Sequence, residues 1–257
     1  MATRTLRLPR AFTREDGRER IAIPFWRGVL FALGSIVIGL SVMTVAMILM
    51  IFAVVLITGN TPSMNPGHPV VAAAELVFYA GAGWFAWRGL STTGVQPFRK
   101  LTRRDGRAIL IGVGALFLVR IATGIVLVLT DQTKHVQAGF EHFDVTSKTQ
   151  AVTATGAALA VLSLVIIAPI VEELVFRGLL FGALAGRLGV LASAIVTALL
   201  FGAAHGDLIL FPTLVAMGFV TALAYAGTGN LWVSVALHAL NNALGAIFIV
   251  GASLTKH

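Results

Sequence analysis

The sequence predicts an all-α, polytopic membrane protein with about seven transmembrane helices. Of its 257 residues, 57% are hydrophobic and only 12% are charged, whereas a water-soluble domain carries about 25% charged residues. The mean hydropathy is +0.90. The apolar runs are far longer than the roughly 10-residue alternating segments of a membrane β-barrel, so helices are the expected way across the bilayer.

Seven apolar runs follow one another along the chain. The first carries no charge and is about twice as long as the apolar part of a signal peptide, so we expect a membrane anchor rather than a cleaved leader. A glycine-rich turn at residues 227–230 separates the last two runs. The predicted spans cover residues 28–58, 69–87, 108–130, 152–186, 188–205, 208–226 and 231–252.

The predicted organisation has three parts: a basic tail at residues 1–24, membrane spans and loops at 25–151, and a helical core at 152–252. Lysine and arginine gather in the tail and in the loop 88–107, which is typical of cytoplasmic segments. We therefore expect a cytoplasmic N-terminus, an outer location for residues 131–151, and the plasma (inner) membrane if the protein is bacterial. Because the cations flank apolar spans, a membrane surface is the expected partner and nucleic acid is not.

The absence of cysteine excludes several kinds of chemistry, and two charged residues in the N-terminal spans predict an ion pair. The chain contains no cysteine, which excludes disulfides, thiol catalysis and thiolate metal sites. In the second and third predicted spans lie Glu75 and Arg120, and an antiparallel arrangement of these spans lets the arginine reach the glutamate. We interpret the two as a structural, buried ion pair.

The charged stretch at Glu172, Glu173 and Arg177 lies inside the fourth predicted span, where charges are costly to bury and therefore indicate function. Arg177 follows Glu173 by four residues, about 40° around a helix, so these two can form an ion pair. Glu172 points about 100° away from Glu173. The expected arrangement is a structural Glu173–Arg177 pair and a Glu172 that faces a cavity, as a general base does. Pro169 is expected to bend this helix and to admit water near Glu172.

Two further polar pairs lie on the following spans. Phe201 and His205 are four residues apart, as are His238 and Asn242, so each pair shares one helix face. Asn242 can orient His238 or donate a hydrogen bond to a developing oxyanion. Glu172 and His205 can meet only if their helices protrude into the cytoplasm or if the second helix breaks at His205–Gly206. We expect the protrusion, with Arg187 solvated at the tip and a cavity that opens to the cytoplasmic half.

Taken in order, these motifs resemble the CPBP intramembrane proteases, the family of CAAX prenyl endopeptidases and related bacteriocin-processing or immunity proteins. The resemblance covers residues 152–250, including the approach 227–232 to the last motif, although Asn230 stands where serine is usual. It implies Glu172, His205, His238 and Asn242 as catalytic residues, with Glu173, Arg177 and Phe201 in support. The implied reaction is hydrolysis of a peptide bond in a membrane-associated peptide or protein, lipidated substrates included, by a water that Glu172 deprotonates.

Two alternatives stay open at this point. Glu172, His205 and His238 also match the donor set of a catalytic zinc site with one open position. We favour chemistry without a cofactor because Glu172 can supply the base and Asn242 the oxyanion donor. The other alternative is a non-catalytic membrane scaffold or bacteriocin-immunity protein that uses the same cavity for binding. A small transporter is disfavoured because the sequence shows no internal repeat.

Overall fold

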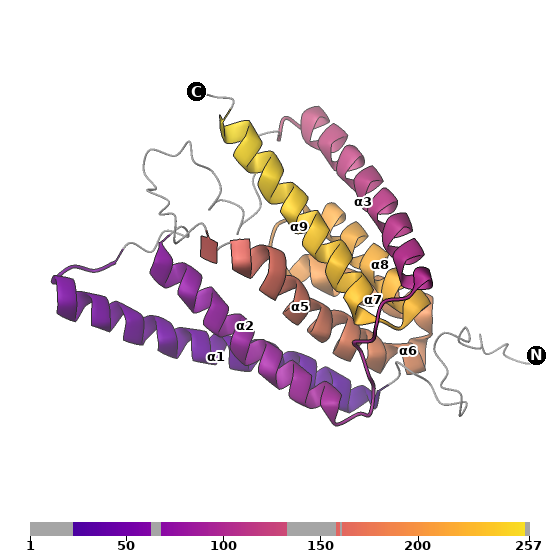
Figure 1. Ribbon diagram of the computed structural model, residues 1–257, viewed down its shortest axis with the longest axis horizontal. Helices are drawn as coiled ribbons and strands as arrows, with labels where there is room; N and C mark the ends of the chain where they lie inside the picture. Colours follow the sequence, from indigo (N-terminus) through magenta and orange to yellow (C-terminus); the bar gives the residue numbers. More distant parts are fainter. Residues whose placement is uncertain (1–22, 63–67, 133–157, 160, 255–257) are drawn as a thin grey trace, which may run out of the picture.

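The computed structural model describes residues 23–62, 68–132, 158–159 and 161–254, and all regular secondary structure in this part of the chain is helical (Figure 1). The predicted basic tail lies almost entirely, and the predicted outer segment 131–151 mostly, outside these residues. The elements are α1 (Phe25–Thr58), α2 (Pro69–Ser91), α3 (Arg103–Leu129), η3 (Leu162–Ile167), α5 (Ala168–Glu173), η4 (Leu174–Phe181), α6 (Gly182–Leu188), α7 (Val190–Ala204), α8 (Phe211–Thr228) and α9 (Leu231–Leu254). The predicted all-α, polytopic fold is confirmed.

Helices α1 and α2 form a long antiparallel hairpin along one side of the molecule (Figure 1). α1 has 34 residues, about 51 Å of helix, so it is longer than the roughly 30 Å hydrocarbon core and must tilt or protrude. α3 begins at Arg103, five residues before its predicted start at 108. The reason is a capping box, in which Thr102 and Asp105 each satisfy the other's backbone N–H.

The elements η3, α5, η4 and α6 follow one another without a break and form the central helix of the molecule. Two of its stretches, η3 and η4, are π-helical, and such wide turns often occur at functional sites. Pro169 lies where η3 gives way to α5. The last bond of the π register runs from the N–H of Ala168 to the carbonyl of Ser163, and the next one cannot form because proline has no N–H.

Helix α7 is short and ends at Ala204. It has 15 residues, about 22 Å, and its C-cap is His205, followed by Gly206 with φ of +65°. The chain therefore breaks at His205–Gly206, which is the alternative to the protrusion that we expected. Since Glu172 precedes the turn at Gly189 by about as many residues as His205 follows it, the antiparallel helices bring both side chains to one level. Arg187 is exposed, with its guanidinium carbon 4.0 Å from the Phe25 ring centroid.

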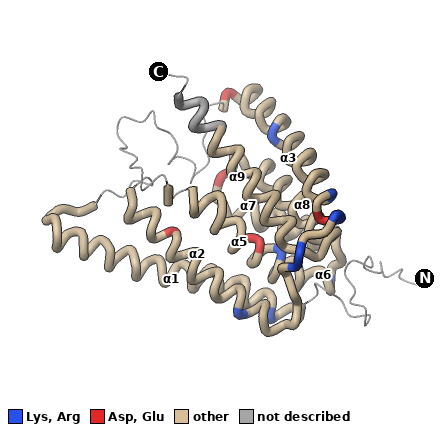
Figure 2. The backbone as a smooth tube through the Cα atoms, in the orientation of Figure 1, with Lys and Arg blue, Asp and Glu red and all other residues tan. Residues whose placement is uncertain are grey.

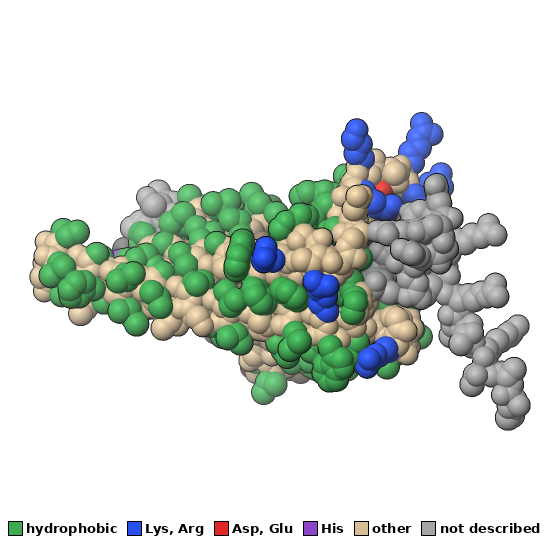
Figure 3. All heavy atoms as spheres, turned by 90° about the horizontal axis from the view of Figure 1, so that it is seen from below, with side chains coloured by type: hydrophobic (Ala, Val, Ile, Leu, Met, Phe, Trp, Pro, Cys, Tyr) green, Lys and Arg blue, Asp and Glu red, His purple; other side chains and the backbone are tan. Residues whose placement is uncertain are grey.

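The surface is that of a membrane protein. The face seen in Figure 3 is covered mainly by apolar side chains. By length and composition, α1, α2, α3 and α8 can each cross a membrane, and α7 and α9 are shorter apolar helices. Lysine and arginine gather at the end of the bundle where α2 ends and α3 begins (Figure 2), from residues Arg88, Arg99, Lys100, Arg103, Arg104 and Arg107.

The loop between α2 and α3 is fastened to the start of α9. The buried Asn230 side chain accepts from the backbone N–H of Arg99 and of Trp232 and donates to the Arg99 carbonyl, all at 3.3 Å. Arg99 in turn donates to the Thr228 carbonyl at 2.6 Å. Asn230 therefore has a structural task at the basic end of the molecule.

The predicted ion pair between Glu75 and Arg120 is wrong. Among the described residues α2 and α3 do not contact each other, because the central helix and α9 lie between them. The Arg120 guanidinium instead donates to the side-chain oxygen of Asn241 at 3.1 Å and to the Asn241 backbone carbonyl. Arg120 thus links α3 to α9.

The close approach of α1 to the central helix at Gly28 gives a test of this packing. A Cβ there would lie 2.5 Å from the Ala183 Cβ and 2.8 Å from the Leu179 carbonyl oxygen. We expect Gly28→Ala to destabilise the protein by about 1–3 kcal/mol, since a backbone neighbour cannot move aside cheaply. This corresponds to a Tm in detergent lower by roughly 2–10 °C. Gly114→Ala, on α3 with open space around it, is the matched control, and an equal loss in both variants would contradict the packing.

Candidate active site

A fully buried charge cluster lies in the core of the bundle. Glu173 Oε1 lies 3.1 Å from Arg177 Nη1 and 3.0 Å from His238 Nδ1, and the side chains of Glu173 and Arg177 are 0% exposed. Because isolated charges are very costly in an apolar interior, each of these groups depends on the others. The predicted Glu173–Arg177 pair is confirmed.

The other contacts of Arg177 tie the central helix to its neighbours. Its Nη2 donates to the Gly218 carbonyl on α8 at 2.8 Å. Its guanidinium carbon lies 4.7 Å from the Phe201 ring centroid on α7, a cation–π contact. The Phe201 ring also packs edge-on against the His238 imidazole, with centroids 5.6 Å apart. The cluster therefore joins four helices and fixes the plane of His238.

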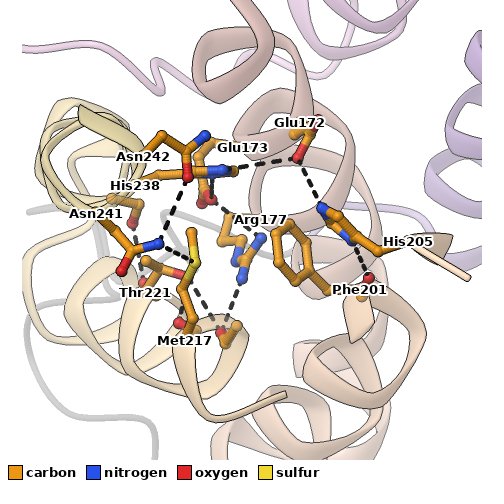
Figure 4. A network of polar contacts seen from close by, with 12 residues as sticks. Glu172, Glu173, Arg177, Phe201, His205, Met217, Thr221, His238, Asn241 and Asn242 are labelled. Carbon is orange, nitrogen blue, oxygen red and sulfur yellow. Dashed lines mark hydrogen bonds and ion pairs between the residues drawn. The ribbon is translucent and has the colours of Figure 1, made fainter. Parts of the chain in front are cut away.

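Glu172 lies beside this cluster but has a different environment (Figure 4). Its side chain is 21% exposed, and its Oε2 lies 3.8 Å from His238 Nε2 and 4.0 Å from His205 Nε2. These distances are too long for hydrogen bonds, and Oε2 has no hydrogen-bond partner among the described residues. Oε1 accepts a hydrogen bond of 3.1 Å from the Tyr79 hydroxyl on α2.

His205 is oriented by its own helix end. Its Nδ1 lies 2.8 Å from the Phe201 carbonyl oxygen, four residues earlier. The Phe201 and His205 ring centroids are 4.6 Å apart, as their predicted shared face requires. Since a carbonyl oxygen can only accept, Nδ1 carries a proton, and the other ring nitrogen, Nε2, lies toward Glu172.

The prediction that Asn242 could orient His238 is wrong, because the residue that contacts His238 Nδ1 is Glu173. The Asn242 Nδ2 instead donates to the Leu164 carbonyl at 2.9 Å. In the π register of η3, this carbonyl is the one that residue 169 would have used, and Pro169 has no N–H to offer. Asn242 therefore satisfies a backbone group that the proline leaves unpaired, and it holds α9 against η3.

A second polar chain reaches the site from α3. Arg120 holds Asn241, whose Nδ2 lies 3.5 Å from Asn242 Oδ1 and 3.1 Å from the Met217 sulfur. Thr123 and Thr213 hydroxyls lie 2.6 Å apart and join α3 to α8 nearby. The intramembrane arginine thus supports the residue next to Asn242.

The fit to a metal depends on how the donors are arranged. Glu172, His205 and His238 are chemically suitable zinc ligands. Within the described residues, however, no three His, Cys, Asp or Glu side chains are grouped so that they could hold a metal ion. We therefore assign no residue to a metal.

The structure brings together all seven residues that the sequence singled out: Glu172, Glu173, Arg177, Phe201, His205, His238 and Asn242. Sequence reasoning missed two contributors. Tyr79 lies 93 residues before Glu172, and no local pattern connects the two. Asn241 is a polar residue inside a predicted span and directly precedes Asn242. This signal could have identified it from the sequence.

One of the comparisons with known proteins, the match to a family model, covers the region that holds these residues. Residues 154–244 match the family model described as type II CAAX prenyl endopeptidase, Rce1-like. The putative membrane peptidase YdiL of Bacillus subtilis (strain 168) is 36% identical over 77 residues, which cover 30% of this chain and 32% of that protein. The membrane-embedded CAAX protease MroQ of Staphylococcus aureus (strain USA300) is 35% identical over 89 residues, 32% of this chain and 36% of that protein.

An uncharacterized 24.3 kDa protein of Escherichia coli is 34% identical over 95 residues, 35% of this chain and 44% of that protein. No solved structure shows a significant match to the chain. The chain spans about a third of the length of the first two relatives. The residues that match the family model include none of α1, α2 or α3.

The link between Pro169 and Asn242 predicts a coupled effect on stability. We expect Asn242→Ala to destabilise the protein by about 1–3 kcal/mol, because the Leu164 carbonyl loses its donor. In a Pro169→Ala background the new N–H can take that carbonyl, so the same substitution should cost less. A double-mutant cycle by thermal unfolding in detergent measures the difference. Additive effects of the two substitutions would contradict the link.

Proposed function

We infer that this chain, whose residues 154–244 match the Rce1-like CAAX prenyl endopeptidase model, is an intramembrane endopeptidase whose general base is Glu172. The observation that supports this most is the unpartnered Glu172 Oε2, 3.8 and 4.0 Å from the Nε2 atoms of two histidines. Polar atoms at such a separation are suited to hold a water molecule between them. The Glu172 side chain is 21% exposed, while its Oε2 atom is buried, so water and a substrate carbonyl reach Oε2 only when the surrounding side chains move apart.

In the proposed mechanism the two histidines have different tasks. Neutral His205 accepts a hydrogen bond from the water through Nε2 and so orients the attacking oxygen. His238 is protonated, which brings the charges of Glu172, Glu173, Arg177 and His238 to a sum of zero in an apolar interior. Its Nδ1–H then faces Glu173, and its Nε2–H is available to an oxyanion.

The bond changes follow from these roles. The water oxygen attacks the peptide carbonyl carbon while Glu172 Oε2 takes a proton, and the carbonyl oxygen becomes an oxyanion. His238 Nε2–H and the second N–H of the Asn242 amide stabilise this charge, since the first N–H serves Leu164. Glu172 passes its proton to the peptide nitrogen, the C–N bond breaks, and an amine and a carboxylic acid leave.

The substrate and the setting follow from the surroundings of the site. A site enclosed by helices that can cross a membrane suits a membrane-associated peptide or protein segment, lipidated substrates included. The relative named a CAAX protease supports this class. The basic end of the bundle (Figure 2) is proposed to face the cytoplasm, with the N-terminus, and the membrane is the plasma membrane if the protein is bacterial.

The proposed base is tested by replacing Glu172 with glutamine, which keeps the shape of the side chain and its bond to Tyr79 but cannot accept a proton. Quantitative membrane proteomics of cells with the wild-type protein or with Glu172→Gln is expected to show an uncleaved precursor in the variant. The rate of its cleavage should fall by roughly 100-fold or more.

Separate His205→Ala and His238→Ala variants should accumulate the same precursor, whereas His68→Ala, at the N-cap of α2, should not. If cleavage and cellular function survive all three site substitutions in protein that remains in the membrane, the enzyme proposal fails and a binding role is the better account.

The proposed chemistry also predicts independence from metal. Purified protein dialysed against a strong chelator should contain no stoichiometric zinc and should cleave the identified precursor at the rate of untreated protein, because Glu172 and His205 suffice to activate water. Elemental analysis and an activity assay before and after chelation measure this. Activity lost on chelation and restored by zinc would contradict the metal-independent mechanism.

A further inference from the structure

The Tyr79 hydroxyl is the single hydrogen-bond donor to the Glu172 carboxylate among the described residues. It comes from α2, outside the region 154–244 that matches the family model. The bond holds Oε1, and this leaves Oε2 facing the two histidines. A glutamate carboxylate otherwise turns easily about its last torsion, which is broad and roughly two-fold.

A close helix contact places Tyr79 within reach. Gly83, one turn after Tyr79 on α2, lies against Val171, the residue before Glu172. A Cβ at Gly83 would be 2.9 Å from Val171 Cγ2. Residues i and i+4 share one helix face, so the contact that lets α2 approach α5 also directs Tyr79 toward Glu172. Helix α2 also carries buried alanines at positions 72, 74, 82 and 86.

We propose that Tyr79 is a positioning residue for the reaction: its hydroxyl fixes Glu172 Oε1 so that Oε2 acts as the base. The proposal rests on the proposed function, because it assigns a role in that reaction. It also gives α2 a part in the active site, so the segment responsible for catalysis extends beyond the family-matched region.

The other tyrosine of the chain supplies a matched control. The sequence has two tyrosines, and Tyr225 is fully buried against Phe181 with a hydroxyl that makes no hydrogen bond among the described residues. Tyr79→Phe and Tyr225→Phe therefore each remove a tyrosine hydroxyl oxygen. The hydroxyl of Tyr79 has a hydrogen-bond partner, and that of Tyr225 has none among the described residues.

The first test is kinetic and uses an internally quenched peptide built on the precursor cleavage site found by proteomics. Tyr79→Phe should lower kcat by roughly 10- to 100-fold, the scale of a misplaced catalytic group, with KM unchanged within about twofold. Tyr225→Phe should leave both constants unchanged. A kcat that is equal in wild type and Tyr79→Phe would overturn the proposal.

The second test does not depend on activity. Protein labelled with 3-fluorotyrosine should give two ¹⁹F resonances, which the two Phe variants assign. Glu172→Ala should shift the Tyr79 resonance and leave that of Tyr225 in place; an unmoved Tyr79 resonance would overturn the proposal. Cleavage that persists in Glu172→Gln would refute the proposed function and the catalytic role of Tyr79 with it, while the NMR result would still decide whether the hydrogen bond exists.

Discussion

The rest of the structure depends on the buried contact of Glu173 with Arg177 and His238. Removing either charge would leave the other uncompensated in a low-dielectric interior, at a cost of about 3–5 kcal/mol. Through the same three side chains the central helix contacts α8, α9 and the Phe201 ring of α7. The positions of both histidines relative to Glu172 therefore follow from one electrostatic requirement.

Around this contact, local departures from regular helix place the remaining groups. The π turns of η3 and the missing N–H of Pro169 free a carbonyl that only a partner from another helix can satisfy, and Asn242 does so. The end of α7 at Ala204 leaves His205 at its cap, with Nδ1 on the Phe201 carbonyl. In each case a helix gives up part of its own hydrogen bonding, and a site residue takes over.

Helical periodicity alone predicted much of this arrangement. The spacing of Glu173 and Arg177 allowed their pairing, the same geometry separated Glu172 from them, and the four-residue spacing put Phe201 beside His205. What periodicity cannot supply is which helices are neighbours. Glu75 and Arg120 were paired because their spans are consecutive, yet the central helix and α9 lie between α2 and α3.

The contacts of Tyr79 and Asn242 were missed for the same reason. One joins residues 93 positions apart and the other 78, and both depend on how closely two helices approach. The register of η3 is a further case, since nothing in the residue pattern distinguishes a π turn from an α turn. Such features are set by packing, so they follow from the assembled bundle rather than from any one segment.

The central claim is that two adjacent glutamates have opposite roles, Glu173 in stability and Glu172 in chemistry. Thermal unfolding of Glu172→Gln and Glu173→Gln in the same detergent tests it most directly. The account predicts a Tm lower by roughly 6–20 °C for Glu173→Gln, because Arg177 loses its buried counter-charge. For the partly exposed Glu172→Gln the expected change is within about 3 °C. Equal losses in both variants, or a larger loss for Glu172→Gln, would contradict the division.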